Sequence, residues 1–365
     1  MTKTATVCSA TVIGLEGILV DVEADVAAGL PAFSLVGLPD ASVKESRDRV
    51  RAAIKNCDVA FPRTHVTVNL APADLRKEGP AFDLPIACAI MLADGKVRFE
   101  REDGSQGEAR AVRGFDHDTL LIGELGLDGS IRPTIGILPV ILAARQRNIQ
   151  TVILPLGNVD EAAVIDGITL LPVVHLREVI GHLLGAERIT PHTRNTNAWT
   201  RDATPSTYDF TYIHGLRHAK RALEIAAAGG HNLLFVGPPG TGKSLLAKAL
   251  PTILPSMTKE EQLEVTLAHS VVGLAPSGGL IRERPFRSPH HSASDIAIIG
   301  GGTIPRPGEV TLAHRGVLFM DEFPEFKRSV LEVLRQPLED GVVTISRAAG
   351  TLTFPARFQL IAAQN

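Results

Sequence analysis

Hydrophobic and polar positions follow two periods over the first half of the chain. Residues 6–13 and 65–70 are rich in β-branched side chains and alternate with the period of two that is typical of strands. Between them, apolar residues recur at helical spacing while charged residues fill the other faces, which predicts an amphipathic helix packed on a sheet. The apolar positions of this helix are Val43, Val50, Ile54 and Cys57.

Two further helices and a strand complete the predicted pattern of this region. We expect more buried helices over 84–92 and 140–147, followed by a strand over 151–155. Strands that are interspersed with helices indicate an α/β or α+β domain. We assign this domain to residues 1–185.

A different pattern begins at residue 208. Each predicted strand is now a continuous apolar run between helices, which predicts a parallel sheet covered on both faces, with its ligand at the carboxyl ends of the strands. The predicted helices span 217–229, 243–250 and 327–338, and the predicted strands span 232–236, 317–320 and 358–363.

The two patterns are separated by residues 186–207, which show no periodicity and are rich in Thr, Asn, Pro and Arg. Such a composition is typical of an exposed connection. We therefore predict a linker over 186–207 between a domain over 1–185 and a second domain over 208–365.

Composition narrows the possible functions. The 365 residues include 37 Lys and Arg and 40 Asp and Glu, a net charge of −3, so any contact with a polyanion must come from a local patch. The three cysteines form no C-x-x-C pair, which favours free thiols in a reducing compartment over disulfides or zinc. No signal-peptide pattern or membrane-length apolar run is present, so we expect a soluble, cytoplasmic protein.

A phosphate-binding loop follows the apolar strand over 232–236. The residues from Gly237 to Ser244 fit the pattern G-x-x-x-x-G-K-[ST] and precede a helical segment. Backbone N–H groups of such a loop surround phosphate oxygens, Lys243 supplies a charge for the β- and γ-phosphates, and Ser244 supplies a hydroxyl for Mg²⁺. The predicted ATP-binding residues are Gly237, Pro238, Pro239, Gly240, Thr241, Gly242, Lys243, Ser244, Leu245 and Asp321.

Polar residues end two later strands. Asp321 and Glu322 follow the apolar run over 317–320, where Asp321 would hold Mg²⁺ and Glu322 would polarise the attacking water. The alternative is a strand that ends in a solvated turn. Asn365 ends the strand over 358–363, at the same edge, and its amide could orient the water. We therefore take Lys243 and Glu322 as candidate catalytic residues, and Asn365 joins them only through a resemblance to a known family.

The segments GPPGTGKS, VLFMDE and FQLIAAQN together resemble an AAA+ ATPase core. The runs over 219–244 and 284–326 resemble more specifically the ComM/YifB family of magnesium-chelatase-like ATPases. The resemblance implies a homohexameric ring that uses ATP and Mg²⁺ to drive branch migration of DNA during recombination of incoming single strands. It assigns Lys243 and Ser244 to the phosphate loop, Asp321 and Glu322 to the metal and water positions, and Asn365 to the first sensor.

The sequence departs from the AAA+ pattern in two places. Ile213-His214-Gly215 falls where AAA+ proteins enclose the adenine, but Leu216 stands where a polar residue often follows. The sequence ends at Asn365, whereas the family continues into an arginine finger, a last core strand and a helical lid. We therefore expect a truncated core that binds nucleotide and hydrolyses it inefficiently.

The first domain resembles the proteolytic domain of Lon over residues 120–185, which implies a Lon-like α+β fold. Lon carries its serine nucleophile in a D-G-P-S loop and activates it with a lysine. Here the matching stretch reads E-G-P-A and places Ala81 at the nucleophile position, and no lysine lies between Lys96 and Lys220. We expect a scaffold without the catalytic dyad, used for assembly or DNA contact.

A basic cluster lies between the two nucleotide motifs. Arg282, Arg284 and Arg287 are candidates for contact with DNA phosphates, because such insertions face the pore in related rings. The alternative is a solvated or inter-subunit ion-pair surface.

Two groups of histidines are candidate metal ligands. His290 and His291 are adjacent, so they do not easily converge on one ion with His314. His214 and His218 lack the Glu of H-E-x-x-H. We therefore expect no zinc site at His290, His291 and His314, of which the first two belong to the basic cluster, and a structural role for His214 and His218.

Three functions remain open at this point. The first is an ATP-dependent motor of the ComM/YifB type that remodels branched DNA. The second is a chelatase-type subunit that inserts Mg²⁺ into a porphyrin, and the third is a nucleotide-binding interaction protein that does not hydrolyse ATP. The Lon-like domain favours the first function, because chelatase motor subunits typically lack it.

Overall fold

The structure is a computed structural model, and it describes residues 4–100, 106–115, 118–193, 208–276, 279–302, 305–347 and 350–365. The chain forms two compact units, which divide between residues 195 and 196, within the predicted linker. Residues 194–207 of that linker lie outside the described residues. Unit 1, before the division, and unit 2, after it, are described separately.

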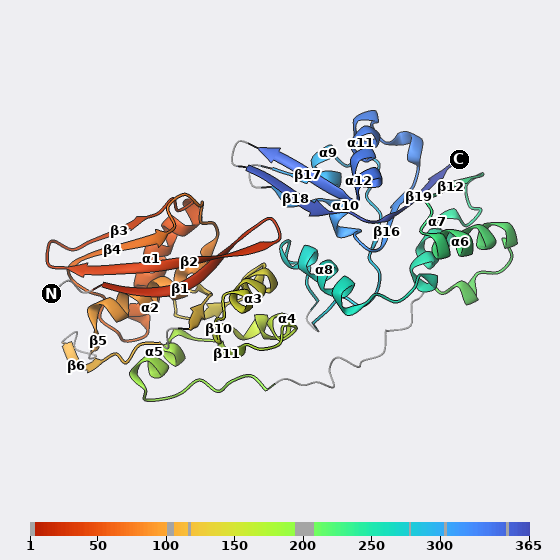
Figure 1. Cartoon of the computed structure of the whole chain (residues 1–365). Helices are drawn as coiled ribbons and strands as arrows, with labels where there is room; N and C mark the ends of the chain where they lie inside the picture. Colours follow the sequence, from red (N-terminus) through yellow and green to blue (C-terminus); the bar gives the residue numbers. More distant parts are fainter. Residues whose placement is uncertain are drawn as a thin grey trace. The chain divides into compact units, whose positions relative to one another are not determined.

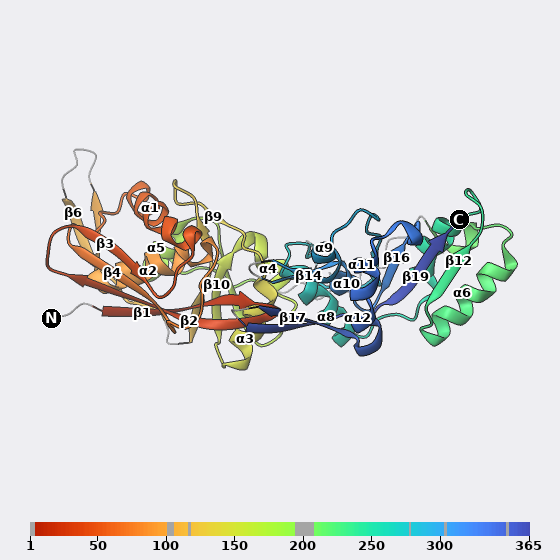
Figure 2. The same cartoon turned by 90° about the horizontal axis from the view of Figure 1, so that it is seen from above.

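Unit 1 contains a seven-stranded mixed sheet with the order β11-β10-β7-β1-β2-β4-β3. Strands β1 and β2 form a long antiparallel hairpin through its middle, with Val7 and Val22 as register partners (Figures 1 and 2). Strand β4 is antiparallel to β2, whereas β7, β10 and β11 are parallel to one another. The strands are β1 (Thr4–Ile13), β2 (Glu16–Ala27), β3 (Ala32–Val36), β4 (His65–Ala71), β7 (Thr119–Leu121), β10 (Thr151–Pro155) and β11 (Thr169–Val173).

The helices of unit 1 bury their apolar residues against this sheet. Helix α2 packs on β1 and β2, and α1 packs on α2, so that Val50 and Leu84 share one core. Helix α1 begins after Asp40, whose carboxylate accepts a hydrogen bond from the Val43 amide at 2.7 Å. The helices are α1 (Ala41–Asn56), α2 (Asp83–Asp94), α3 (Ile137–Gln146), α4 (Val159–Ala162) and α5 (Leu176–Leu184), with short 3₁₀ turns at Pro80–Phe82 and Leu156–Asn158. Four short strands form two further ribbons, β5 (Lys96–Glu100) with β6 (Gln106–Ala111) and β8 (Glu124–Leu125) with β9 (Ile131–Arg132).

An ion pair is built into the core of unit 1. Asp83, at the start of α2, is fully buried and accepts hydrogen bonds from Arg49 Nε at 2.7 Å and Arg49 Nη2 at 3.0 Å. The Leu125 amide donates to the same carboxylate at 3.2 Å. Burial raises the pKa of Asp83, and the hydrogen bond from Arg49 acts in the opposite direction. The pair therefore links α1 to the first turn of α2 inside the core.

Unit 2 contains a four-stranded sheet with the order β12-β19-β16-β13 in which every pairing is parallel, as predicted. Figure 2 shows β12, β19 and β16 side by side. The buried side chains of Phe235, Phe319 and Ile361, one from each of these strands, form its core with helical residues. The strands are β12 (Leu233–Val236), β13 (Phe286–Arg287), β16 (Val317–Met320) and β19 (Gln359–Gln364).

The remaining elements of unit 2 are short. The helices are α6 (Arg217–Gly229), α7 (Lys243–Ala249), α8 (Lys259–Ser270), α9 (Asp295–Ile299), α10 (Glu309–Leu312), α11 (Arg328–Val333) and α12 (Arg335–Asp340), with 3₁₀ turns at Phe210–Tyr212, Leu250–Ile253 and Phe323–Glu325. Two hairpins complete the unit, β14 (Gly300–Gly301) with β15 (Arg306–Pro307) and β17 (Val342–Arg347) with β18 (Gly350–Pro355).

The single helix predicted over 327–338 is wrong, because the structure has two helices there. Helix α11 ends at Val333 and α12 begins at Arg335. Pro337 lacks the N–H that would bond to the carbonyl of Val333, so the helical ladder is interrupted at this point. Apolar residues keep their helical spacing through the break, which is why periodicity alone predicts one helix.

Helix α8 lies in a region for which the sequence analysis predicts no helix. It begins at a capping box in which the Thr258 hydroxyl accepts from the Glu261 amide and the Glu261 carboxylate accepts from the Thr258 amide, both at 3.2 Å. This T-x-x-E signature is visible in the sequence and could have predicted the helix. Within the described ranges, no helix is long and apolar enough to cross a membrane.

Candidate nucleotide site

The predicted phosphate loop connects the end of β12 to the start of α7, the context in which such a loop binds phosphate. Strand β12 ends at Val236 and α7 begins at Lys243. Gly240 and Gly242 have φ angles of 79° and 87°, in the left-handed region that favours glycine. Side chains at these positions would strain the loop, so its glycines are required by its shape.

Strand pairing brings Asn365 to this loop. Strands β12 and β19 are neighbours, with Val236 opposite Gln364, so the residue after β19 lies beside the residues after β12. The Lys243 ammonium donates to the Asn365 side-chain oxygen at 2.9 Å. It also donates to the carbonyl of Pro238 at 3.0 Å and to that of Gly237. The loop carbonyls and the side chain of Asn365 thus hold the lysine over the loop.

The two predicted Mg²⁺ residues are hydrogen-bonded to each other. The Ser244 hydroxyl donates to Asp321 Oδ2 at 2.7 Å, joining the first turn of α7 to the end of β16. A hydroxyl and a carboxylate are both oxygen donors, the kind that Mg²⁺ prefers. The structure shows no cluster of three or more His, Cys, Asp or Glu among its described residues, but Mg²⁺ in nucleotide sites keeps waters and phosphate oxygens as its other ligands. The donor set at this site therefore fits magnesium.

Glu322 is held in place by its backbone and by a histidine. Its φ angle is 52°, unusual for a residue with a side chain, and its amide donates to Asp321 Oδ1 at 3.0 Å. Its carboxylate Oε2 lies 3.0 Å from His291 Nδ1. The ring of His291 also lies against His290 and, edge-on, against Phe326. The sequence pattern places His291 in a basic cluster and does not predict this contact with Glu322.

The segment predicted to enclose the adenine lies next to the phosphate loop. Ile213 is buried in the core of unit 2, and Leu216 has a φ angle of 53° just before α6. The side chain of Leu216 is 3.3 Å from the point that a Cβ on Gly242 would occupy. The hydrophobic side chain of Leu216 therefore packs beside the phosphate loop at Gly242.

Arg284 and Arg287 are engaged by partners within unit 2, rather than lying on a solvated or inter-subunit surface as the alternative to DNA contact proposed. Arg284 donates to the carbonyls of Pro255 at 2.7 Å and Arg315 at 2.6 Å. Arg287 forms a bidentate ion pair with Glu309, with N–O distances of 2.6 and 2.8 Å. Hydrogen bonding to Glu309 raises the pKa of Arg287. The geometry therefore favours structural roles over DNA contact for these two arginines, while Arg282 is half-buried and also has an interaction partner.

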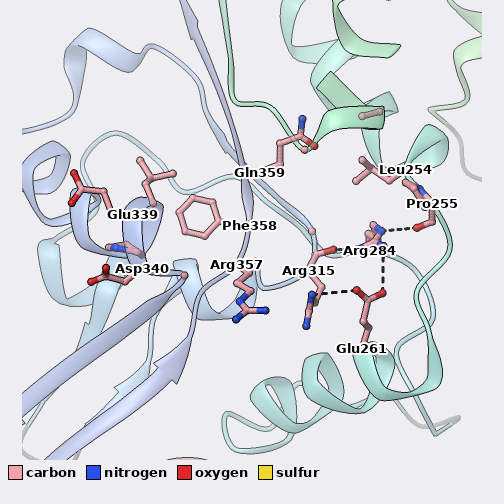
Figure 3. A pocket seen from close by; sticks show the side chains of 16 residues that line it. Leu254, Pro255, Glu261, Arg284, Arg315, Glu339, Asp340, Arg357, Phe358 and Gln359 are labelled. Atoms are coloured by element: carbon pink, nitrogen blue, oxygen red, sulfur yellow. Dashed lines mark hydrogen bonds and ion pairs between the residues drawn. The ribbon is translucent and has the colours of Figure 1, made fainter. Parts of the chain in front are cut away.

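A cavity of about 520 Å³ lies at the opposite ends of the strands of this sheet, where the strands begin. Its walls include Arg315 and Phe358, which come shortly before β16 and β19, whereas Asp321 and Asn365 follow the same strands. Figure 3 shows Arg284 and Arg315 there, both paired with Glu261. The ion-paired cavity and the nucleotide motifs thus occupy opposite ends of the strands.

His314 is buried beside this cavity and carries hydrogen bonds on both nitrogens. Its Nε2 lies 3.1 Å from Glu264 Oε2, and its Nδ1 accepts from the Arg357 amide at 3.0 Å. Burial lowers the pKa of His314, although the hydrogen bond to Glu264 opposes this. Its partners are a carboxylate and a backbone amide, which is a structural role.

In unit 1, the structure places Ala81 in the 3₁₀ turn before α2. Its carbonyl accepts from the Gly123 amide at 2.9 Å. Pro139, near which a Lon-type lysine would be expected, lies in α3. Neither position offers a nucleophile or a base.

Comparisons with known proteins identify the family to which both halves of the chain are similar. Residues 209–365 match the family model described as "Magnesium chelatase, subunit ChlI", and residues 22–158 match "Subunit ChlI of Mg-chelatase". The chain is similar to competence protein ComM of Haemophilus influenzae, with 45% identity over 99% of this chain and 68% of the relative. It is also similar to YifB of Escherichia coli, with 42% identity over 97% of this chain and 66% of that protein.

Chelatase subunits match less of the chain. The magnesium-chelatase 38 kDa subunit of Acidiphilium rubrum is 28% identical over 43% of this chain and 52% of that subunit. A solved complex of subunits BchI and BchD of magnesium chelatase covers 40% of this chain and 51% of its own, with 26% identity and a TM-score of 0.34. The long matches to ComM and YifB decide the assignment: the chain belongs to the ComM/YifB family of magnesium-chelatase-like AAA+ ATPases.

Proposed function

We propose that unit 2 binds ATP with Mg²⁺ and that the protein uses ATP hydrolysis to remodel branched DNA by branch migration. The observation that carries the nucleotide part is the convergence of Ser244 on Asp321 and of Lys243 on Asn365. These four side chains come from three neighbouring parallel strands and the helix that follows one of them. They meet at the carboxyl ends of the strands, where ligands bind in such folds.

Each group has a distinct part in the proposed chemistry. Lys243 provides positive charge for the β- and γ-phosphates, and loop amides and the start of α7 donate to phosphate oxygens. Ser244 and Asp321 are the residues that would hold Mg²⁺, which when bound neutralises phosphate charge. Glu322 is positioned to accept a proton from the attacking water, and Asn365 to orient that water.

The DNA part of the proposal rests on the family. ComM and YifB relatives match both units, which supports a shared activity for the whole chain. We propose assembly into a homohexameric ring in the cytoplasm, with a Lon-like unit 1 that lacks the protease dyad. Arg284 and Arg287 are left out of the proposed DNA surface because carboxylates and carbonyls already hold them.

The first experiment tests nucleotide binding. Binding of a fluorescent ATP analogue is measured with Mg²⁺ for the unaltered chain and for Lys243→Ala, which should abolish it. The matched control is Lys248→Ala, because Lys248 is an exposed lysine of the same helix whose ammonium lies over Tyr208, 5.1 Å from the ring centre. Equal losses in both variants would contradict the assignment of the loop.

The second experiment tests the DNA activity. ATP turnover and dissociation of a labelled four-way junction are measured together, with single-strand and linear duplex DNA for comparison. Junction-stimulated turnover with strand exchange supports the proposal. An ATP turnover rate that no DNA changes would contradict the proposal. ATP-dependent insertion of Mg²⁺ into a porphyrin, without any effect on DNA, would also contradict it.

A further inference from the structure

Unit 1 contains a cavity of about 610 Å³ that no sequence motif predicts. It lies between the exposed side of α1, the start of β3 and the segment that leads into β4. Four basic residues and two phenylalanines are among the residues that line it: Arg47, Arg51, Lys55, Arg63, Phe33 and Phe61.

The basic side chains of this cavity are mostly available to a ligand. Arg51, Lys55 and Arg63 are exposed, and within the described ranges Lys55 and Arg63 form no ion pair. Arg47 differs, because it pairs with its neighbour Asp48 at 3.1 Å. The four basic residues and the one acidic residue, Asp48, that line the cavity thus leave it a net charge of +3 in a chain whose net charge is −3.

The aromatic rings form a half-buried wall beside these charges. Phe33 and Phe61 lie with ring centres 5.8 Å apart and an angle of 31° between their planes. The guanidinium of Arg51 lies over the ring of Phe61, 5.8 Å from its centre. Such a pairing orients the arginine while leaving its N–H groups free to donate.

We propose that this cavity binds a short segment of single-stranded nucleic acid. Arg51 and Lys55 are four residues apart on α1, one helical turn or about 6 Å along the axis, so both charges face the same side and can follow one phosphate backbone. Phe33 and Phe61 supply apolar surface on which a base can stack. Cations that follow the backbone beside stacking rings are the usual chemistry of single-strand sites.

This inference deepens the proposed function, on which it rests for the presence of DNA. Branch migration separates and re-pairs strands, so a site for unpaired DNA on unit 1 would hold a strand. An acidic peptide would use the same positive charges but has no bases to stack, and the aromatic wall therefore favours nucleic acid.

The test measures binding of a fluorescein-labelled thymidine 20-mer by anisotropy over a series of salt concentrations. Arg51→Gln/Lys55→Gln should weaken binding and reduce the slope of log K against log salt by about 1.4, or about 0.7 for each cation. The matched control is Arg145→Gln/Arg147→Gln, which removes two exposed charges from the end of α3 and should change neither quantity. Equal affinities and slopes for the two double variants would overturn the proposal.

A second variant tests the aromatic wall. Phe61→Leu keeps an apolar side chain and the charges, and should weaken binding at least about fivefold through lost stacking. Thermal unfolding of the same sample checks that unit 1 remains folded. An unchanged affinity in a folded Phe61→Leu protein would overturn the stacking part, and polyglutamate that competes as well as the oligonucleotide would overturn the choice of nucleic acid.

The outcome is separable from that of the proposed function. Lys243→Ala should lose ATP binding and keep the oligonucleotide affinity of unit 1, whereas Arg51→Gln/Lys55→Gln should do the reverse. A protein that binds the 20-mer at this cavity but ignores junctions would contradict branch migration and leave the cavity site standing. A protein that turns over ATP on junctions with unchanged kinetics in the double variant would overturn the cavity site.

Discussion

The Nδ1 atom of His291 lies 3.0 Å from the Oε2 atom of Glu322, the residue proposed to activate the attacking water. The histidine follows β13 and the glutamate follows β16, so parallel pairing of these two strands brings the residues together. A carboxylate engaged by a histidine is less available to accept a proton from water. The contact therefore restrains the proposed catalytic group.

Replacement of His291 by Ala should raise the ATP turnover measured without DNA. The gain is at most about tenfold, because one exposed hydrogen bond to a charged group contributes about 1.5 kcal/mol. Steady-state turnover of His291→Ala is compared with that of His290→Ala, since the Nδ1 atom of His290 faces Ser292 instead. A lower turnover in His291→Ala would show that the contact orients Glu322 productively.

Ser244→Ala should weaken the affinity for ATP when Mg²⁺ is present, at least about tenfold, which corresponds to about 1.4 kcal/mol. The variant loses the hydroxyl beside Asp321 and so one oxygen donor of the proposed metal site. Calorimetric titrations with MgCl₂ and with EDTA measure the difference. Ser329→Ala is the matched control, because it removes a similar bond to Asp295, at 3.0 Å, between two residues outside the proposed ATP and Mg²⁺ ligands. Equal affinities with and without Mg²⁺ would argue against this metal site.

The structure around His314 should lose local stability as the pH falls below about 6.5, the ordinary pKa of histidine. Burial lowers the pKa of His314, so the unfolded state takes up a proton at a higher pH than the folded state does, and stability is lost on acidification. Protonation of Nδ1 would also remove the acceptor for the Arg357 amide. Exchange of that amide, corrected for its intrinsic pH dependence, should accelerate between pH 7.5 and pH 5.5. His314→Gln should remove this pH dependence, and retention of it would contradict the assignment.

Arg49→Ala should destabilise unit 1 by about 3 kcal/mol, because it leaves the Asp83 carboxylate buried without its main partner. Denaturant unfolding followed through hydrogen exchange in α2 measures the loss. Arg47→Ala removes an exposed pair with Asp48 and should have little effect. Adding Asp83→Asn to Arg49→Ala should recover part of the stability. Equal effects of the two arginine variants would mean that the buried pair contributes little.

Much of the fold could be predicted from local patterns. The strand predicted over 6–13 and the helix predicted around Val50 are confirmed in β1 and α1. The phosphate loop was predictable because its glycines, lysine and serine are contiguous and the flanking strand and helix are short apolar runs. The break at Pro337 and the capping box at Thr258 carried readable signals that periodicity alone does not use.

The sequence by itself determined the residue types at the nucleotide site, since Lys243 and Ser244 begin a predicted helix and Asp321 and Asn365 follow predicted strands. Only the tertiary structure decided which of them touch, because the strand order β12-β19-β16-β13 depends on which strands find partners across long stretches of chain. That order puts Asn365 beside Lys243 and His291 beside Glu322. It also engages Arg284 and Arg287 with acceptors that lie more than twenty residues away, a pairing that no local pattern encodes. The cavity of unit 1 likewise arises only where α1 packs beside Phe61, because charges and rings that are separate in sequence become a surface through folding.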